Sequence, residues 1–371
     1  MIKILHIAKP VAGVGVYIQL LSKYIDPNKF QNEIILNNSD NNIEILDNLG
    51  NQIKSYHLNL EREVSFFKDL VVFSQMIKMV KKIRPDVIHC HSAKAGILGR
   101  LVGSVLNIKT IYTPHAYSYL SSESRKKKVV LKFIEKCFGY LSTHTVTCSN
   151  SEYNRAVCDL KIDKKKVFLW NNSIEKDIIS KSSKYLNALP KDYICSIGRP
   201  CYQKNTELMI NAILMAKEDY KSIHLVILGV GFYSPSLEKI KKFILDNKLS
   251  ENITLIPWLE RSESLGILKN SLFYISSSRY EGLPYSVIEA LALKKPCILT
   301  NVDGNRDLVK NNYNGFLVEQ KAEIMANSIV NLNNNREVLA SMSENSRSEF
   351  EKFYQINKNI KSLENLYLRP Q

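Results

Sequence analysis

Residues 276–305 read SSSRYEGLPYSVIEALALKKPCILTNVDGN, and their pattern indicates how the chain folds. The run LFYISSS at 272–278, which leads into this stretch, predicts a β-strand. Pro284 then stands where its fixed φ suits the first turn of a helix. A further apolar run, PCILT at 296–300, follows that helix. A strand, a helix and a strand in this order predict a parallel sheet covered by helices.

Two glutamates flank the start of this predicted helix. Glu281 precedes the helix, and Glu289 lies in its second turn. The backbone N–H groups of Tyr285 and Ser286 have no partner within the helix, so they suit an anion. The two carboxylates can therefore contact two parts of one elongated ligand. The alternative is that Glu281 only balances the helix dipole and Glu289 only faces solvent.

The same alternation of short apolar runs and helical segments continues along all 371 residues. A prior of roughly 150 residues per domain then predicts two domains, each a doubly wound Rossmann-like α/β fold, with a cleft between them. We expect the first domain at 1–185 and the second at 186–346, divided near Pro190, with a C-terminal helix at 347–371. Strands are predicted at 2–8, 32–36, 86–91, 110–115 and 143–148, and then at 194–198, 224–229, 253–257, 272–278 and 296–300.

Glycines follow the first predicted strand. The segment KPVAGVGVY at 9–17 places Gly13 and Gly15 just before a helix. Backbone N–H groups at such a point suit a phosphate, because they are exposed and the helix dipole favours negative charge. A plain strand-to-helix turn is the alternative.

The first strand of the second half ends in SIGRPCYQKN at 196–205, which brings two cations to a helix entry. Arg199 can bind a phosphate through two N–H groups, and Lys204 acts as a point charge. Gly198 and Gly229, at the ends of neighbouring predicted strands, leave room for a ligand. Parallel strands share one carboxyl edge, so we expect an anion site here rather than a pair of unrelated surface cations.

The net charge of +15 is concentrated in the first half, where residues 1–185 carry 28 Lys and Arg against 16 Asp and Glu. A surface of this kind can attract anionic lipid, nucleic acid or a phosphate-bearing substrate, or it can simply be solvated. We expect it to hold the protein at an anionic membrane surface. The densest basic run, which leads into the apolar stretch VVLKFIEKCFGYL, is Arg125, Lys126, Lys127 and Lys128.

Cysteine spacing and hydropathy bear on the compartment. The seven cysteines include no C-x-x-C pair, which predicts reduced thiols in the cytosol. The opening segment contains Lys9, Pro10 and two glycines, so it predicts a strand, a loop and a helix rather than a signal peptide. No apolar run reaches the roughly 18 residues that a membrane-spanning helix needs. We therefore expect a cytoplasmic protein that is peripheral to the inner face of the membrane.

The segment EGLPYSVIE (281–289) resembles the E-x7-E signature of the large family of retaining glycosyltransferases with the GT-B fold. Bacterial capsule and O-antigen transferases and sucrose-type synthases belong to this family, and the resemblance extends over nearly the whole chain. The other similar segments are the glycine loop with Gly13 and Gly15, PDVIHCHS at 85–92, YTPHAY at 112–117, and the G-R-x4-K element from Gly198 to Lys204.

The resemblance implies a role for each matching residue. Arg199 and Lys204 would hold the donor diphosphate. Glu289 would bind the ribose hydroxyls and Glu281 the donor sugar, while His115 would lie near the reacting sugar. The C-terminal helix would cross back to the first domain. Asp307 replaces a glutamate that is frequent in the family, which leaves its role open.

The resemblance also implies the chemistry. A sugar would pass with retention from a nucleotide-sugar, most often a UDP-sugar, to a lipid-linked or glycan acceptor during cell-surface polysaccharide synthesis. The donor's own leaving phosphate would accept the acceptor proton, and Arg199 and Lys204 would stabilise that phosphate. No D-x-D element follows a predicted strand, so we expect neither a metal ion nor a cofactor.

Two other functions are compatible with parts of the sequence. The basic composition would suit a nucleic-acid-binding protein, although no nucleic-acid motif is present and we expect no such partner. The fold class would also suit a nucleotide-sugar epimerase. His91, His144 and His224 lie in or beside apolar strands, which favours structural roles over catalytic ones.

Overall fold

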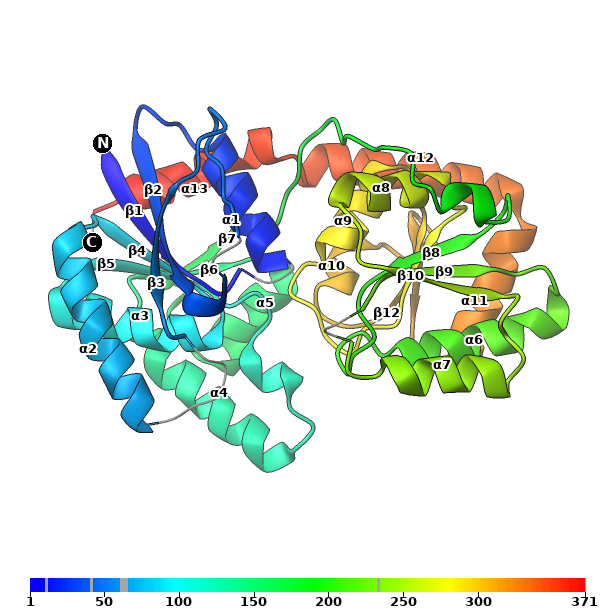
Figure 1. Cartoon of the computed structure of the whole chain (residues 1–371), viewed down its shortest axis with the longest axis horizontal. Helices are drawn as coiled ribbons and strands as arrows, with labels where there is room; N and C mark the ends of the chain where they lie inside the picture. Colours follow the sequence, from blue (N-terminus) through cyan, green and yellow to red (C-terminus); the bar gives the residue numbers. More distant parts are fainter. Residues whose placement is uncertain (11–12, 41–42, 61–65, 232–233, 371) are drawn as a thin grey trace. The chain divides into compact units, whose positions relative to one another are not determined.

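The computed structural model describes residues 1–371 except 11–12, 41–42, 61–65, 232–233 and 371 (Figure 1). The chain forms two compact units. The first contains residues 1–172 and 356–371, and the second contains residues 173–355. Each unit has one parallel β-sheet with helices on its faces, which confirms the predicted α/β class of two doubly wound domains.

The division between the units differs from the expected boundaries after residues 185 and 346. Ile174 is fully buried, and its backbone pairs with Gln355 of the same unit. Further along, the Lys181 N–H donates to the Ser262 carbonyl at 2.9 Å. The polar stretch around Pro190 therefore belongs to the second unit, because hydrogen bonds tie the preceding residues to that unit's helices.

The first sheet has the strand order β3-β2-β1-β4-β5-β6-β7. Its strands are β1 Ile2–Ile7, β2 Phe30–Asn37, β3 Lys54–Leu58, β4 Val87–His91, β5 Lys109–Thr113, β6 His144–Thr147 and β7 Val167–Leu169. Its helices are α1 Gly13–Tyr24, α2 Phe66–Ile83, α3 Ala93–Leu106, α4 Arg125–Gly139, α5 Asn150–Asn154 and α13 Ile356–Leu368. The order reverses between β1 and β4, and in doubly wound sheets ligands bind outside the carboxyl ends of strands at such a switch point.

The second sheet has the strand order β10-β9-β8-β11-β12-β13, which reverses between β8 and β11. Its strands are β8 Ile194–Ile197, β9 Leu225–Val230, β10 Ile253–Pro257, β11 Tyr274–Ser276, β12 Cys297–Thr300 and β13 Gly315–Val318. Its helices are α6 Thr206–Asp219, α7 Leu237–Asp246, α8 Arg261–Asn270, α9 Tyr285–Ala292, α10 Asn305–Leu308, α11 Ala322–Asn334 and α12 Arg336–Phe353.

Sequence reasoning missed the three short strands β3, β7 and β13. β3 and β13 are outermost in their sheets, and β7 closes the far edge of the first one. The strand β3 reads KSYHL and is mostly exposed or half-buried, so it lacks the continuous apolar run of a central parallel strand. β7 (VFL) and β13 (GFLV) are apolar but only three and four residues long, which is too short for a recognisable strand pattern.

The C-terminal helix α13 packs in the first unit, as the resemblance implied. Lys109 holds its last turn, because the ammonium donates to the carbonyls of Leu366 at 2.6 Å and Arg369 at 2.7 Å. A lysine is well suited to the unpaired carbonyls at a helix C-terminus. The expected helix at 347–371 is in fact two helices, because α12 ends at Phe353 and α13 begins at Ile356.

Candidate active site

In the second unit, Gly198 and Gly229 lie at the carboxyl ends of the neighbouring strands β8 and β9. A Cβ atom on Gly198 would lie 3.0–3.2 Å from three carbons of the Lys204 side chain. Gly198 thus lets the stem of Lys204 cross directly over the backbone at the switch point. Gly229 has φ +87°, which a side chain would strain, and its Cβ would lie 3.8 Å from the Gly198 backbone.

Lys204 reaches Glu281, which follows β11. The Lys204 ammonium lies 2.7 Å from Glu281 Oε1, and Glu281 is buried. Ser278 Oγ donates to the same oxygen at 2.7 Å, and Gln203 Nε2 donates to Oε2 at 3.1 Å. Burial acts to lower the pKa of Lys204, yet the charge of Glu281 leaves that pKa above its usual value. The two residues therefore form a preorganised ion pair.

The loop that carries Glu281 is held by its neighbours. A Cβ atom on Gly304 would lie 2.6 Å from the Gly282 carbonyl oxygen, so only glycine allows these two backbones to approach so closely. The Gly304 N–H donates to Asp307 Oδ2 at 3.0 Å at the start of α10. Asp307 therefore caps the helix whose first turn supports the Glu281 loop.

Glu289, on α9, belongs to a second ionic cluster. Its Oε1 accepts from Arg261 Nε at 2.6 Å, and Arg261 Nη1 donates to Glu175 Oε2 at 3.2 Å. Burial raises the pKa of Glu289, and the guanidinium of Arg261 opposes that rise. Arg261 Nη2 is buried without a hydrogen-bond partner in the described part of the chain. Sequence reasoning missed Arg261 and Glu175, since neither lies in a recognised motif.

Three other predicted site residues, Arg199, Tyr285 and Ser286, lie in the same unit. Arg199 is partly exposed, and no ion pair joins its guanidinium to another described residue. Tyr285 and Ser286 form the first turn of α9, as predicted, and Ser286 Oγ accepts from the Tyr274 hydroxyl at 3.0 Å. Tyr274 in turn lies on β11, so the start of α9 is tied to the strand at the switch point.

In the first unit, Gly13 and Gly15 lie in the first turn of α1 rather than in a loop before it. A Cβ atom on Gly15 would lie 3.0 Å from the Pro10 carbonyl oxygen, so glycine allows the helix to start tightly against the end of β1. The intervening residues 11–12 lie outside the described part of the chain. The predicted phosphate contact at this turn stays a prediction.

His115 follows β5 in an unusual backbone turn. His115 has φ +53° and Ala116 has φ +78°, both in the left-handed region that such residues rarely adopt. The carboxylate of buried Glu152 accepts from the Ala116 N–H at 2.8 Å and from the Cys148 N–H at 2.7 Å. Backbone strain of this kind persists only when surrounding contacts fix it, and Glu152 supplies one such contact by linking the Ala116 N–H to the Cys148 N–H after β6.

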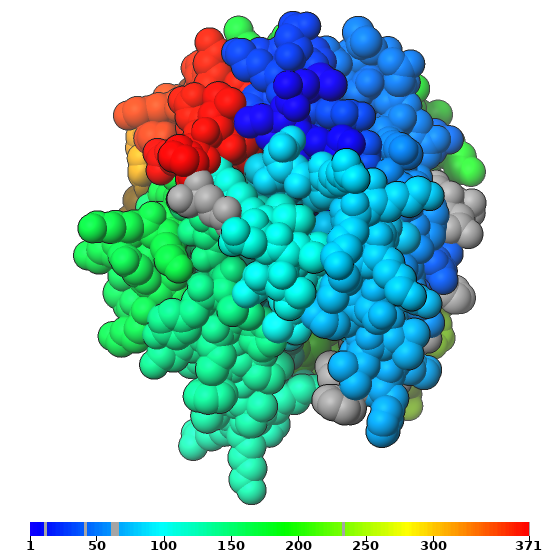
Figure 2. Space-filling model, turned by 90° about the vertical axis from the view of Figure 1, so that its left-hand side faces the viewer, coloured from blue at the N-terminus to red at the C-terminus, as the bar shows by residue number. Residues whose placement is uncertain are grey.

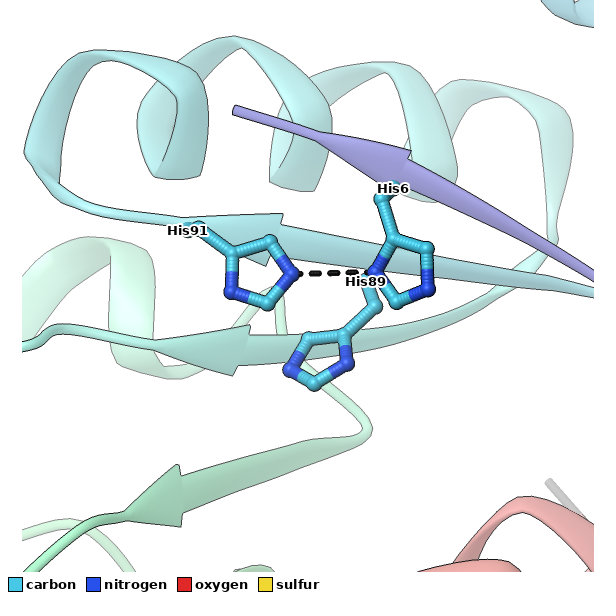
Figure 3. Close-up of side chains that lie close together, drawn as sticks. All are labelled: His6, His89 and His91. Carbon is cyan, nitrogen blue, oxygen red and sulfur yellow. Dashed lines mark hydrogen bonds between the residues drawn. The ribbon is translucent and has the colours of Figure 1, made fainter. Parts of the chain in front are cut away.

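Three further histidines, His6, His89 and His91, are buried in the same unit, and Figure 3 shows them together. His91 contacts His115 through Nδ1 and Nε2 at 3.1 Å, and it contacts His6 through Nε2 and Nδ1 at 3.1 Å. Burial lowers the pKa of His6 to about 4 and that of His115 to about 3. His91, which the sequence favoured as purely structural, thus touches a candidate site residue.

The nitrogens of His6, His89 and His91 also lie within 4.8 Å of one another, as a metal site would require. Neutral imidazoles are common ligands of zinc and related ions. Here, however, each ring nitrogen already has a hydrogen-bond partner. His89 contacts the Tyr367 hydroxyl at 2.7 Å and Thr113 Oγ1 at 2.8 Å. A metal ion would have to displace several of these bonds.

The basic run forms the start of α4, which stands out in cyan-green on the face shown in Figure 2. Arg125, Lys126, Lys127 and Lys128 are all exposed. The next turns also expose apolar side chains, with Val129 at 68% and Phe133 at 65%. On its inner side α4 is held by Glu135, whose buried carboxylate pairs with Arg100 at 3.3 Å. In the described residues, no helix is both long and apolar enough to span a bilayer.

Comparisons with known proteins give the family. Residues 11–177 match Glycosyltransferase Family 4, and residues 177–349 match Glycosyl transferases group 1. The chain is 27% identical over 337 residues to the Escherichia coli UDP-Gal:alpha-D-GlcNAc-diphosphoundecaprenol alpha-1,3-galactosyltransferase, covering 87% of this chain and 86% of that protein. It is 23% identical to the capsular polysaccharide biosynthesis glycosyltransferase CapM of Staphylococcus aureus, over 88% of this chain and 89% of that protein.

The solved structures agree with the fold. Sucrose-phosphate synthase from Thermosynechococcus elongatus superposes with a TM-score of 0.81 at 17% identity, covering 99% of this chain and 98% of that one. The resemblance that the E-x7-E segment indicated is thereby confirmed, together with the GT-B fold class. The chain belongs to the GT-B glycosyltransferases, with a Glycosyltransferase Family 4 domain followed by a Glycosyl transferases group 1 domain.

Proposed function

We propose that this glycosyltransferase moves a sugar with retention from a UDP-sugar to a lipid-linked or glycan acceptor in cell-surface polysaccharide synthesis. The observation that carries this proposal is the Lys204–Glu281 pair beside Arg199 at the switch point of the second sheet. The E. coli relative is named for a UDP-sugar donor, a diphosphoundecaprenol acceptor and an alpha linkage. An alpha linkage is what retention from an α-linked donor gives.

In this proposal the second unit binds the donor. Arg199 and Lys204 stabilise the negative charge that grows on the leaving diphosphate as its bond to the sugar breaks. Glu281, held by Lys204, Ser278 and Gln203, accepts hydrogen bonds from the donor sugar. Glu289 accepts from the ribose hydroxyls. The acceptor oxygen forms the new bond on the same face, and its proton passes to the leaving phosphate oxygen.

The buried histidines of the first unit do not favour a bound metal ion. We propose that transfer requires no metal ion or cofactor, because the cations of Arg199 and Lys204 already supply the positive charge. In support, the ring nitrogens of His6, His89 and His91 have hydrogen-bond partners that a bound ion would displace. Activity that survives dialysis against a chelator would agree with this proposal, and activity restored only by added metal would contradict it.

The anomeric outcome tests the reaction class. The protein is incubated with a panel of UDP-hexoses and UDP-N-acetylhexosamines and with short-chain lipid-diphosphate sugars. We expect a product whose new anomeric proton shows the small coupling of an α linkage when the donor is α-linked. A product of β configuration would contradict retention. Conversion of the donor sugar without an acceptor would identify an epimerase instead.

We also propose that α4 holds the protein at an anionic membrane surface. The helix presents four exposed cations followed by exposed Val129, Val130 and Phe133, and exposed Tyr140 directly follows it, so charge and apolar area lie together. Each basic residue near such a surface contributes about 1 kcal/mol of attraction. Apolar side chains at the same place add burial at the interface between headgroups and acyl chains.

Vesicle co-sedimentation tests this attachment. Changing Arg125, Lys126, Lys127 and Lys128 to Gln should release the protein from vesicles that contain anionic lipid, at moderate salt. The matched control removes the same charge elsewhere, by Lys239→Gln, Lys241→Gln, Lys242→Gln and Lys248→Gln on and just after α7. Equal loss in both variants would show that only net charge matters, and unchanged binding of the α4 variant would reject the proposal.

A further inference from the structure

Four buried or half-buried side chains form a single line of hydrogen bonds in the first unit. Asn32 Oδ1, on β2, lies 3.2 Å from His6 Nε2, on β1. His6 Nδ1 lies 3.1 Å from His91 Nε2, at the end of β4. His91 Nδ1 then lies 3.1 Å from His115 Nε2, after β5. His6 and His91 are fully buried, whereas His115 is partly exposed. The line therefore leads from the core to the surface.

Asn32, at the buried end of this line, determines which ring nitrogen of each histidine carries the proton. Burial keeps the pKa of each ring low, so the imidazoles are neutral and each carries one N–H and one lone pair. The carbonyl oxygen of Asn32 can only accept, so His6 must donate to it from Nε2. His6 Nδ1 then accepts from His91 Nε2–H, and His91 Nδ1 accepts from His115 Nε2–H.

We propose that Asn32, His6 and His91 are positioning residues that hold His115 as the neutral Nε2–H tautomer, with the Nδ1 lone pair offered to a hydroxyl of the bound substrate. Nδ1 has no hydrogen-bond partner among the described residues. The ring is also oriented by Tyr17, whose edge-on contact has a centroid distance of 4.7 Å. The inference depends on the proposed function only in naming a substrate hydroxyl as the donor.

The line fixes a tautomer and does not conduct a proton. A proton taken up at His115 Nδ1 could pass along the rings only if the far end accepted one, and an amide carbonyl does not. Within the described residues, no carboxylate hydrogen-bonds to any of the three imidazoles, so a positive charge on them has no partner. A histidine that acts as a general base is usually oriented by a carboxylate that stabilises its imidazolium. His115 is therefore a hydrogen-bond acceptor rather than a base.

The tautomers can be read directly from the 15N shifts of the imidazoles in the histidine-labelled full chain. We expect His6, His91 and His115 to be Nε2–H tautomers at pH 7.5 and to remain neutral at pH 5.5. An Nδ1–H tautomer at His115, or an even mixture, would overturn the inference without any variant. Stoichiometric shifts of the His6 and His91 signals on addition of Zn²⁺ would instead identify a metal site, and would also overturn it.

Two variants of Asn32 separate tautomer control from packing. Asn32→Asp keeps the shape and an accepting oxygen, so His115 should keep its tautomer at pH 8 while the rings titrate at higher pH than in wild type. Asn32→Leu removes the accepting oxygen, so His115 should become a mixture of tautomers. An unchanged His115 spectrum in Asn32→Leu would show that Asn32 does not set the tautomer.

Transfer assays with these variants test the substrate contact separately. An even mixture leaves about half of His115 as the accepting tautomer, so we expect about a twofold fall in kcat/KM for Asn32→Leu and none for Asn32→Asp at pH 8. If the spectra are as expected but Asn32→Leu transfers sugar at the wild-type rate, the tautomer assignment stands and the contact of His115 with substrate is rejected. An absence of transfer in wild type with every donor would count against the proposed function and leave the spectra to decide the tautomer.

Discussion

The carboxyl edges of the two sheets occupy equivalent places in their folds but use opposite chemistry. At the switch point of the second sheet the buried polar groups are ionic, with Lys204 on Glu281 and, on the neighbouring helices, Arg261 on Glu289. At the switch point of the first sheet they are neutral, with an amide and a line of imidazoles that ends at His115. One fold thus presents a charged edge and an uncharged one.

The difference follows from how each side chain responds to burial. A carboxylate or an ammonium that loses water needs an opposite charge nearby, and both glutamates of the second unit have one. An imidazole that loses water can release its proton and stay hydrogen-bonded, so the histidines need no counter-ion. A charged edge suits a diphosphate that gains negative charge during transfer, whereas a neutral edge suits the hydroxyls of a sugar.

We expect the largest effect from removing the cations at the charged edge of the second sheet. Lys204→Ala and Arg199→Ala should each lower kcat by about 100-fold to 1,000-fold, because each removes a donor aimed at the leaving phosphate. The double variant should lose less than the product of the single losses if both act on one charge.

Melting temperatures of the three variants serve as the folding control for this experiment. Lys204→Ala also leaves the buried carboxylate of Glu281 without its ammonium, so comparing Lys204→Ala with Glu281→Gln against Glu281→Gln alone separates that effect from the loss of the cation. If the folded single variants kept a kcat within about threefold of wild type, stabilisation of the leaving phosphate by these cations would be contradicted, since such a loss is under 1 kcal/mol.

Changes in the second ionic cluster, formed by Arg261, Glu289 and Glu175, should alter the affinity for the donor rather than the rate of the transfer step. Glu289→Ala should raise the donor KM, and Glu281→Ala should mainly lower kcat. Arg261→Gln removes the charge-assisted hydrogen bond that holds the carboxylate of Glu289. We expect this loss to raise the donor KM by about tenfold to 100-fold, the size of a hydrogen bond to a charged group. The opposite kinetic signatures for the two glutamates would reverse their assignment.

The pH dependence of Arg261→Gln sharpens this test. Burial already raises the pKa of Glu289, and Arg261 counteracts that rise, so its removal should raise the pKa further. The donor KM of Arg261→Gln should therefore increase more steeply than that of wild type as the pH falls from 8 to 6. Glu175→Gln, which changes the other partner of Arg261, is the control: the charge of Glu175 also raises the pKa of Glu289, so its removal should make the KM profile no steeper than that of wild type.

The buried neutral histidines of the first sheet should lower the free energy of unfolding below pH 6.5. The unfolded chain binds protons at its histidines there, while buried His6 stays neutral until about pH 4, so stability falls as the pH is lowered. Each such group contributes about 1.4 kcal/mol per pH unit. Between pH 7.5 and 5.0, wild type should lose about 2 kcal/mol more stability than His6→Gln.

Urea unfolding at the two pH values measures this difference. His57→Gln is the matched control, because His57 is exposed on β3 and its removal should leave the pH dependence unchanged. If His6→Gln destabilised as much as wild type on acidification, His6 would not be a buried neutral group.

The sequence alone predicted the α/β class, the two successive series of strands and helices, and the family. It also brought Gly198, Lys204 and Glu281 to one sheet edge. These features were accessible because they depend on local patterns, namely apolar runs, helix starts and polar residues at strand ends. Parallel strands place all their carboxyl ends on one edge, so proximity there follows from topology without knowledge of side-chain geometry.

The tertiary structure alone decided which groups form pairs. Arg261 and Glu289 are 28 positions apart, and Arg261 and Glu175 are 86 apart, with no shared motif to connect them. His6 and His91 are 85 positions apart, so a pattern of single histidines in apolar strands favoured isolated structural roles. The partner of a buried polar group depends on strand order, side-chain rotamer and burial together, and a local stretch of sequence specifies none of these.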